Sequence, residues 1–92
     1  MPSVHHNRER SRYEIVVDDT VVGFADYRRR DGVVVFPHTV IDPPHRRGGL
    51  GAVLVRGALD DVRRSGARVV PLCWYVAHFV DENPEYRDLL AA

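Results

Sequence analysis

The chain has 92 residues, of which 45% are hydrophobic, and its formal net charge is +0. This length supports one small domain with a single hydrophobic core, and the balanced charge excludes a general attraction to nucleic acid or to anionic membranes. All 13 residues counted as Lys or Arg are Arg, and Cys73 is the only cysteine; this excludes chemistry that needs a lysine, an intramolecular disulfide or a cluster of cysteine metal ligands.

The N-terminal residues are polar. Residues 1–12 lack the apolar run of a secretory signal, and no segment reaches the roughly 18 to 20 apolar residues that span a bilayer. Together with the single cysteine, this predicts a cytoplasmic protein. We expect residues 1–92 to form one domain with a flexible tail over residues 1–11, in which the adjacent His5 and His6 are solvated rather than metal ligands.

Three β-type runs are predicted in the first half of the chain. Residues 13–17 (YEIVV) are rich in β-branched and aromatic residues, and a second run covers residues 20–30, with Gly23 as a candidate bulge. The dipeptide Asp31-Gly32 predicts a tight hairpin into a third strand over residues 33–41. These runs form an antiparallel meander, and the continuous apolar start of the third strand indicates a central position, covered on both faces.

A basic, glycine-rich turn and an amphipathic helix come next. Pro43 and Pro44 end the third strand, because proline cannot donate to a neighbouring strand. Residues 46–52 (RRGGLGA) then enter a helix predicted over residues 50–64, which ends at Ser65-Gly66. Glycines let backbone N–H groups approach a ligand, and the first helical turn leaves such groups unpaired, so this turn is typical of a phosphate site.

The C-terminal third predicts one more strand and a short helix. Residues 67–72 return parallel to the third strand through a right-handed crossover, and Pro71 indicates an edge or a splayed partner. Residues 74–81 form a helix in which Trp74 is expected to face inward, and Asn83-Pro84 ends it. The predicted fold class is therefore α+β.

The turn resembles the acetyl-CoA signature of the GCN5-related acetyltransferase superfamily, Gln/Arg-x-x-Gly-x-Gly/Ala, which residues 46–52 fill at every position. Residues 38–41 (HTVI), 71–76 (PLCWYV) and 83–86 (NPEY) are similar to the smallest members of that superfamily. This resemblance implies that the third and fourth strands splay apart and that the pantetheine arm lies between them. The sequence departs from it at Pro37, where relatives often carry an acidic residue.

The resemblance implies an acetyl-CoA site and transfer of the acetyl group to an amine of a small molecule or a protein, with no metal. A Walker-type loop would need a lysine, and a dinucleotide fingerprint would need glycine where Leu54 stands. A glycine-rich turn that serves only packing is the remaining alternative. The residues expected to bind the cosubstrate are Thr39, Val40, Ile41, Arg46, Arg47, Gly48, Gly49, Leu50, Gly51 and Ala52.

Three residues are candidates for catalysis, since acyl transfer needs a base for the acceptor and a proton for the leaving thiolate. His38 is a candidate base or a structural residue, because imidazole gains and loses protons near neutral pH. Cys73 could accept the acetyl group, protonate the leaving thiolate or only pack. Tyr75 is a candidate acid or a core residue.

The alternative function is a CoA-thioester binding or sensing module without turnover. We expect a monomer or a weak homodimer, with no nucleic-acid or membrane partner and an acceptor pocket that is shallow or completed by a second subunit. Residues 28–30 (RRR) are interpreted as a solvated strand end, with a phosphate contact as the alternative.

Overall fold

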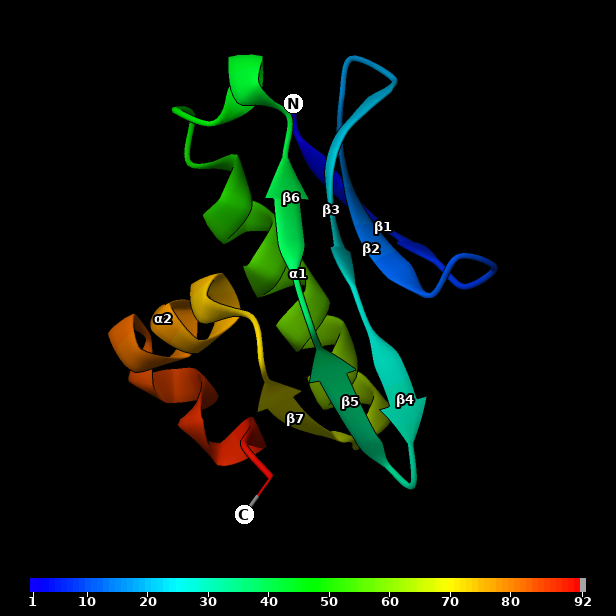
Figure 1. Ribbon diagram of the computed structural model, residues 1–92, viewed down its shortest axis with the longest axis vertical. Helices are drawn as coiled ribbons and strands as arrows, with labels where there is room; N and C mark the ends of the chain where they lie inside the picture. The colour runs from blue at the N-terminus through cyan, green and yellow to red at the C-terminus, as the bar shows by residue number, and fades with distance from the viewer. Residues whose placement is uncertain (92) are drawn as a thin grey trace.

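One long helix, α1, lies across two small β-sheets, and a second helix, α2, lies beside the shorter sheet (Figure 1). The computed structural model describes residues 1–91. The elements in chain order are β1 Ser3–Asn7, β2 Arg12–Val17, β3 Thr20–Asp26, β4 Arg28–Arg30, β5 Val33–Phe36, β6 Thr39–Ile41, the 3-10 helix η1 Pro43–His45, α1 Leu50–Ser65, β7 Arg68–Pro71, α2 Trp74–Glu82 and the 3-10 helix η2 Pro84–Leu89.

The predicted strands pair in the predicted order, but they are divided between two sheets, and β1 is added to one of them. Strands β1, β2, β3 and β6 form an antiparallel sheet, and β4, β5 and β7 form the second, with β7 parallel to β5. Asp31 and Gly32 both have positive φ, at 53° and 77°, as the predicted hairpin between β4 and β5 requires. Helix α1 supplies the crossover from β6 to β7. The α+β fold class is confirmed.

Both long predicted strands are interrupted. The second run breaks at Tyr27, and the third breaks at Pro37 and His38. Because proline has no N–H to offer a neighbouring strand, the third run divides at this point, and its two halves enter different sheets. Gly23 lies where the β2–β3 register shifts, and a Cβ there would approach the Val40 backbone oxygen to 2.7 Å. The predicted bulge is therefore confirmed.

The expected N-terminal tail is wrong, because β1 pairs with β2 along its whole length. Val4 packs on α1 where Gly57 leaves room: a Cβ at Gly57 would lie 2.7 Å from Val4 Cγ2. His6 lies between Tyr27 and the α1 residue Asp61, with Nε2 2.6 Å from the Tyr27 hydroxyl and Nδ1 3.2 Å from Asp61 Oδ2. The polar sequence SVHHN conceals this strand because a hydrogen-bonded histidine occupies one of its two inward positions.

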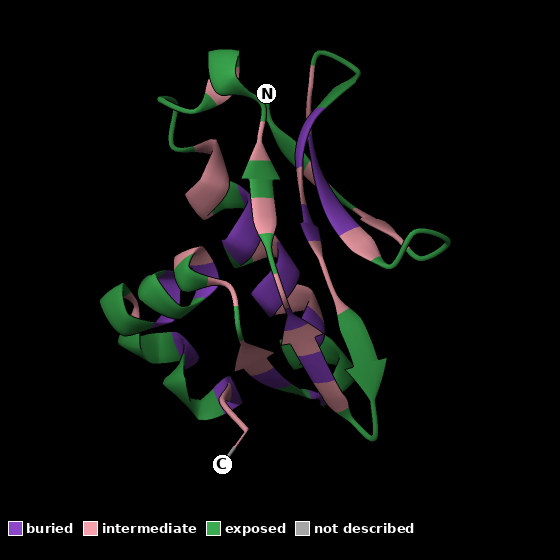
Figure 2. Ribbon diagram, viewed as in Figure 1, coloured by how far each residue is buried: buried purple, intermediate pink, exposed green. Residues whose placement is uncertain are grey.

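The hydrophobic core lies between α1 and the sheets, and Figure 2 shows the buried residues gathered there. Trp74 does not join it: the expectation that it faces inward is wrong, and its side chain is 74% exposed and stacks on His78. The inward face of α2 is formed by Val76, Phe79 and Val80, whose spacing of three and four excludes Trp74. The largest fully buried side chains are Phe36, Ile15, Leu54, Leu59, Val34, Val55, Val62, Val69 and Val76.

The helices found in residues 1–91 are all too short or too polar to cross a bilayer. Tyr86 is buried, and its hydroxyl donates to Asp60 Oδ1 at 2.7 Å. Arg56 donates to the same hydroxyl at 3.2 Å. These bonds join η2 to α1 and close the C-terminal end of the domain.

Candidate functional site

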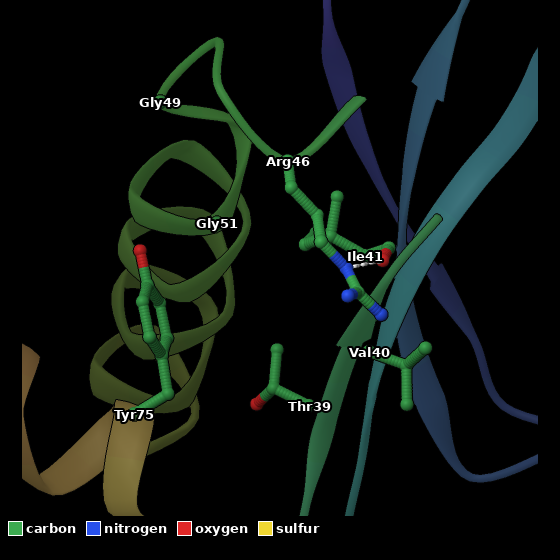
Figure 3. Close-up of a pocket in the computed structure, with 7 residues that line it drawn as sticks. All are labelled: Thr39, Val40, Ile41, Arg46, Gly49, Gly51 and Tyr75. Carbon is green, nitrogen blue, oxygen red and sulfur yellow. Dashed lines mark hydrogen bonds between the residues drawn. The ribbon is translucent and has the colours of Figure 1, made fainter. Parts of the chain in front are cut away.

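A cleft of about 350 Å³ opens between β6 and the N-terminal ends of α1 and α2 (Figure 3). β6, α1 and α2 each contribute residues that the sequence predicts to bind the cosubstrate or to take part in catalysis. The lining residues are Thr39, Val40, Ile41, Arg46, Gly49, Gly51 and Tyr75.

The cleft exists because the third and fourth predicted strands separate. The parallel pairing of β5 with β7 ends at Phe36 opposite Pro71, and the N–H of Cys73 makes a last bond to the Phe36 carbonyl at 2.8 Å. Beyond this point β6 pairs with β3 and forms the edge of the other sheet. Pro71 lies at the point of separation, as predicted. The outer edge of β6 therefore offers backbone groups to a ligand.

The glycine-rich turn forms one end of the cleft, where Arg46, Gly49 and Gly51 line it. Gly49 is the N-cap of α1 and has φ +72°, a backbone conformation that side chains other than glycine rarely adopt. The first helical bond runs from the N–H of Val53 to the Gly49 carbonyl, at 3.3 Å. The three preceding N–H groups, of Leu50, Gly51 and Ala52, have no acceptor within the helix and carry the positive end of its dipole.

The two arginines of the turn are placed differently. Arg46 extends along the cleft, where its Nε donates to the Ile41 carbonyl at 2.9 Å (Figure 3). This bond fixes a positive charge against the end of β6. Arg47 and Gly48 are exposed at the tip of the turn and do not line the cleft. The turn thus presents one anchored guanidinium and one that is exposed to solvent.

Tyr75 forms the wall opposite β6. Its ring lies over the first turn of α1, and a Cβ at Gly51 would come within 2.6 Å of its hydroxyl oxygen, so the second glycine of the signature makes room for this tyrosine. Burial raises the pKa of Tyr75, so the phenol stays protonated at neutral pH and can only donate a proton. Figure 3 shows the side chain of Thr39 directed toward Tyr75 and that of Val40 directed away, which leaves Val40 only its backbone to offer.

Cys73 is the N-cap of α2, and its Sγ lies 3.5 Å from Oγ1 of Thr39. Burial alone would raise the pKa of this thiol. The thiol donates to Thr39 Oγ1, whereas the thiolate accepts hydrogen bonds from the Thr39 hydroxyl and from the backbone N–H groups of Val76 and Tyr75. These bonds to the thiolate act against burial, and the net effect lowers the pKa of Cys73. A helix N-terminus favours a thiolate for the same reason. The surroundings of Cys73 therefore make its thiolate, the nucleophilic form, easier to reach than that of an ordinary cysteine.

His38 does not line the cleft. It lies in the connection between β5 and β6, one residue before Thr39, and its side chain is 58% exposed. Its Nε2 is 2.6 Å from Oδ2 of Asp26, and the N–H of Asp26 donates to the His38 carbonyl at 3.1 Å. The sequence does not identify Asp26 as a candidate functional residue, because its contact with His38 depends on the register in which β3 pairs with β6. Asp26 thus places a carboxylate against His38, although residue 37 is a proline.

A comparison with known protein families shows to which family this chain belongs. A family model described as GCN5-related N-acetyl-transferase matches residues 12–89. The chain belongs to this family. The match covers every element that forms the cleft in this GCN5-related N-acetyltransferase domain, from β2 through η2.

Relatives and a solved structure agree with this membership. Protein NATD1 from Bos taurus is 31% identical over 84 residues, which cover 88% of this chain and 74% of that protein. The human NATD1 is 29% identical over 84 residues, with the same shares of the two chains. The solution structure of a GCN5-like protein from Staphylococcus aureus superposes with a TM-score of 0.73 at 15% identity, covering 98% of this chain and 88% of the other. This last similarity shows the fold.

Proposed function

We propose that this protein binds acetyl-CoA in the cleft and transfers the acetyl group to an amine. The observation that carries the proposal is the cleft itself, which has unpaired helical N–H groups at one end and is lined by Thr39, whose hydroxyl contacts the Cys73 thiol of lowered pKa. The N–H groups of α1 and Arg46 would bind the pyrophosphate, each charge-assisted bond contributing about 1.5 to 3 kcal/mol. The amides of the pantetheine arm would pair with the free edge of β6.

The position of Cys73 supports a covalent route. The Cys73 thiolate attacks the carbonyl carbon of the acetyl thioester, the bond from that carbon to the CoA sulfur breaks, and CoA leaves as a thiolate. The acceptor amine then attacks acetyl-Cys73 and passes its proton to a base, and the Cys73 thiolate leaves. Thr39 stabilises the thiolate in both steps through its hydroxyl.

His38 is the proposed base for the amine. Its Nε2–H donates to Asp26, which leaves Nδ1 with a lone pair that can accept a proton. Asp26 fixes this tautomer and the ring orientation, so it is a positioning residue. The exposure of His38 lets the accepted proton pass to water. Tyr75 can protonate CoA as it leaves, because its phenol remains protonated.

The acceptor would approach the part of the site that solvent already reaches. Leu72 and Trp74, on either side of Cys73 in the chain, are 68% and 74% exposed and provide apolar surface beside the thiol. Amines of a small molecule or of a protein surface both fit such an open site. A cytoplasmic location stays a prediction from the single cysteine.

The proposed activity is tested by two measurements on the same preparation. Calorimetry should show saturable binding of acetyl-CoA, and chromatography should show CoA release that depends on an added amine from a panel of small amines and peptides. Tight binding without amine-dependent CoA release would contradict the transferase and favour the binding module. Absence of acetyl-CoA binding would contradict both functions.

The substitution Asp26→Asn should lower kcat about tenfold while acetyl-CoA affinity stays the same, because the amide no longer enforces the tautomer in which Nδ1 accepts a proton. His38→Ala should cost more, about 10² to 10⁴ in kcat. Steady-state kinetics with an acceptor amine measures both. Asp19→Asn, which removes one exposed turn carboxylate, is the charge-matched control. Equal kcat for Asp26→Asn and Asp19→Asn would refute the positioning role.

A further inference from the structure

A second hollow, of about 620 Å³, lies at the opposite end of α1 from the glycine-rich turn. A helix of 16 residues spans about 24 Å, so this hollow is well separated from the acetyl-CoA cleft. It is formed by the turn after β1, the junction of β3 with β4, and the last turn of α1. Its lining residues are His6, Arg8, Tyr27, Arg29, Asp61, Arg64 and Ser65.

The charges around this hollow do not balance. Arg8, Arg29 and Arg64 bring three guanidinium groups to it, against the single carboxylate of Asp61. Arg64 lies 3.4 Å from Asp61 Oδ1. Neither Arg8 nor Arg29 has a side-chain hydrogen bond or ion pair with any of residues 1–91. Two unpaired positive charges therefore share one concave surface in a chain whose net charge is +0.

The carboxylate of Asp61 is already engaged at the floor of the hollow. It accepts a hydrogen bond from the Tyr13 hydroxyl at 2.6 Å and lies 3.2 Å from His6 Nδ1. Burial lowers the pKa of His6, and the positive charges of Arg8 and Arg29 lower it further, against the field of Asp61. Arg8 and Arg29 thus lie close enough to His6 to lower its pKa. Because Asp61 already has partners at the floor of the hollow, the floor offers no further negative charge to these two arginines.

We propose that this hollow binds a small phosphorylated anion through Arg8, Arg29 and Arg64. A guanidinium donates two parallel hydrogen bonds to phosphate oxygens, and a phosphate dianion balances the two unpaired arginines, which a single carboxylate does not. The volume lies within the usual range for small-molecule sites. The ligand is distinct from acetyl-CoA bound in the cleft, and the proposal does not depend on acetyltransferase activity.

The floor of the hollow disfavours nucleic acid as the occupant. The rings of His6, Tyr13 and Tyr27 pack against one another, with centroid separations of 4.3, 5.4 and 5.5 Å. These rings are occupied with their own contacts and offer no free face on which a base could stack. A small anion needs only the guanidinium groups and the volume between them.

Inorganic pyrophosphate at fixed ionic strength is the probe, and the backbone amide signals of the full chain in ¹H–¹⁵N NMR are the readout. We expect saturable shifts at Arg8, Arg29 and Ser65. Arg29→Gln and Arg8→Gln should each weaken this binding about tenfold, because each removes a charge-assisted pair. Both side chains are exposed, so neither substitution disturbs the core.

Arg28→Gln is the matched control, because neighbouring strand residues alternate faces and Arg28 does not line the hollow. Figure 2 shows the whole of β4 exposed, so the control also matches in solvent access. It should change affinity less than about twofold, as expected for a distant exposed charge. Equal weakening by Arg28→Gln and Arg29→Gln would overturn the site. So would shifts confined to the Gly48–Ala52 turn, shifts that do not saturate, or tighter binding of a short single-stranded RNA.

Discussion

Acetyl-CoA affinity should fall more than about 100-fold when Gly49 is replaced by valine. At φ +72° a side chain other than glycine costs about 1 to 2 kcal/mol, and a β-branched one costs more, so the turn is expected to relax into another conformation. The N–H groups of Leu50 and Gly51 would then no longer converge on one anion. Losing two charge-assisted bonds of about 1.5 to 3 kcal/mol each gives the expected loss, which calorimetry with acetyl-CoA measures.

Gly32→Val separates lost binding from lost stability. Gly32 has φ +77° and, like Gly49, no atom within 4 Å of a built Cβ, but it lies in the β4–β5 turn, outside the cleft. The two variants should lose similar amounts of stability in urea unfolding, and only Gly49→Val should lose acetyl-CoA binding. Equal affinity of Gly49→Val and the parent protein would show that this turn does not bind the pyrophosphate.

The sequence predicts best the features that depend on the backbone conformation of a few consecutive residues. Asp31-Gly32 specifies its hairpin, Gly66 ends α1 in the left-handed conformation, and the RRGGLGA turn enters its helix where expected. Pro71 marks the splay because the loss of one N–H has the same meaning in any fold. Each of these signals depends on a few consecutive residues, and the structure confirms each of them.

The features that the sequence conceals depend on partners far along the chain. The side chain of His6 packs against two residues far along the chain: its Nε2 is hydrogen-bonded to the Tyr27 hydroxyl, and its Nδ1 lies 3.2 Å from Asp61 Oδ2. Nothing in the sequence around residue 6 records these contacts. The partnership of His38 with Asp26 depends on the β3–β6 register, in which Ala25 lies opposite Thr39. Arg8, Arg29 and Arg64 likewise line one hollow although they are far apart in the sequence, and no sequence motif connects them.

The positions proposed for catalysis show the same division. The resemblance of residues 71–76 to a family motif identifies Cys73 and Tyr75 as candidates. It does not predict where their side chains point. The structure brings Cys73 to Thr39 and packs Tyr75 against Gly51 on the side of the cleft opposite β6. Their different neighbours give their pKa values opposite directions, lowered for the thiol and raised for the phenol. One group is thereby suited to attack and the other to donate a proton.

Incubation with acetyl-CoA alone should add one acetyl group to Cys73 in the parent protein and none to Cys73→Ser. Amine-dependent CoA release should fall by at least about 100-fold in Cys73→Ser, because a serine hydroxyl is not ionised at neutral pH and no residue beside it replaces the thiolate. Serine preserves the size of the side chain and its contact with Thr39, so acetyl-CoA affinity should be retained. Intact-protein mass spectrometry and chromatography of released CoA measure the two effects.

The pH dependence of Cys73 alkylation by iodoacetamide tests the cause of this reactivity. Because the pKa of Cys73 is lowered, the rate should reach its plateau at a lower pH than that of an ordinary thiol, whose pKa is about 8.5. Thr39→Val removes a hydrogen bond that lowers this pKa and retains the size of the side chain, so it should move the plateau to higher pH and slow acetylation at neutral pH. Unchanged amine-dependent CoA release in Cys73→Ser would instead mean that the amine attacks the thioester directly, with His38 as base and Cys73 as a wall of the site.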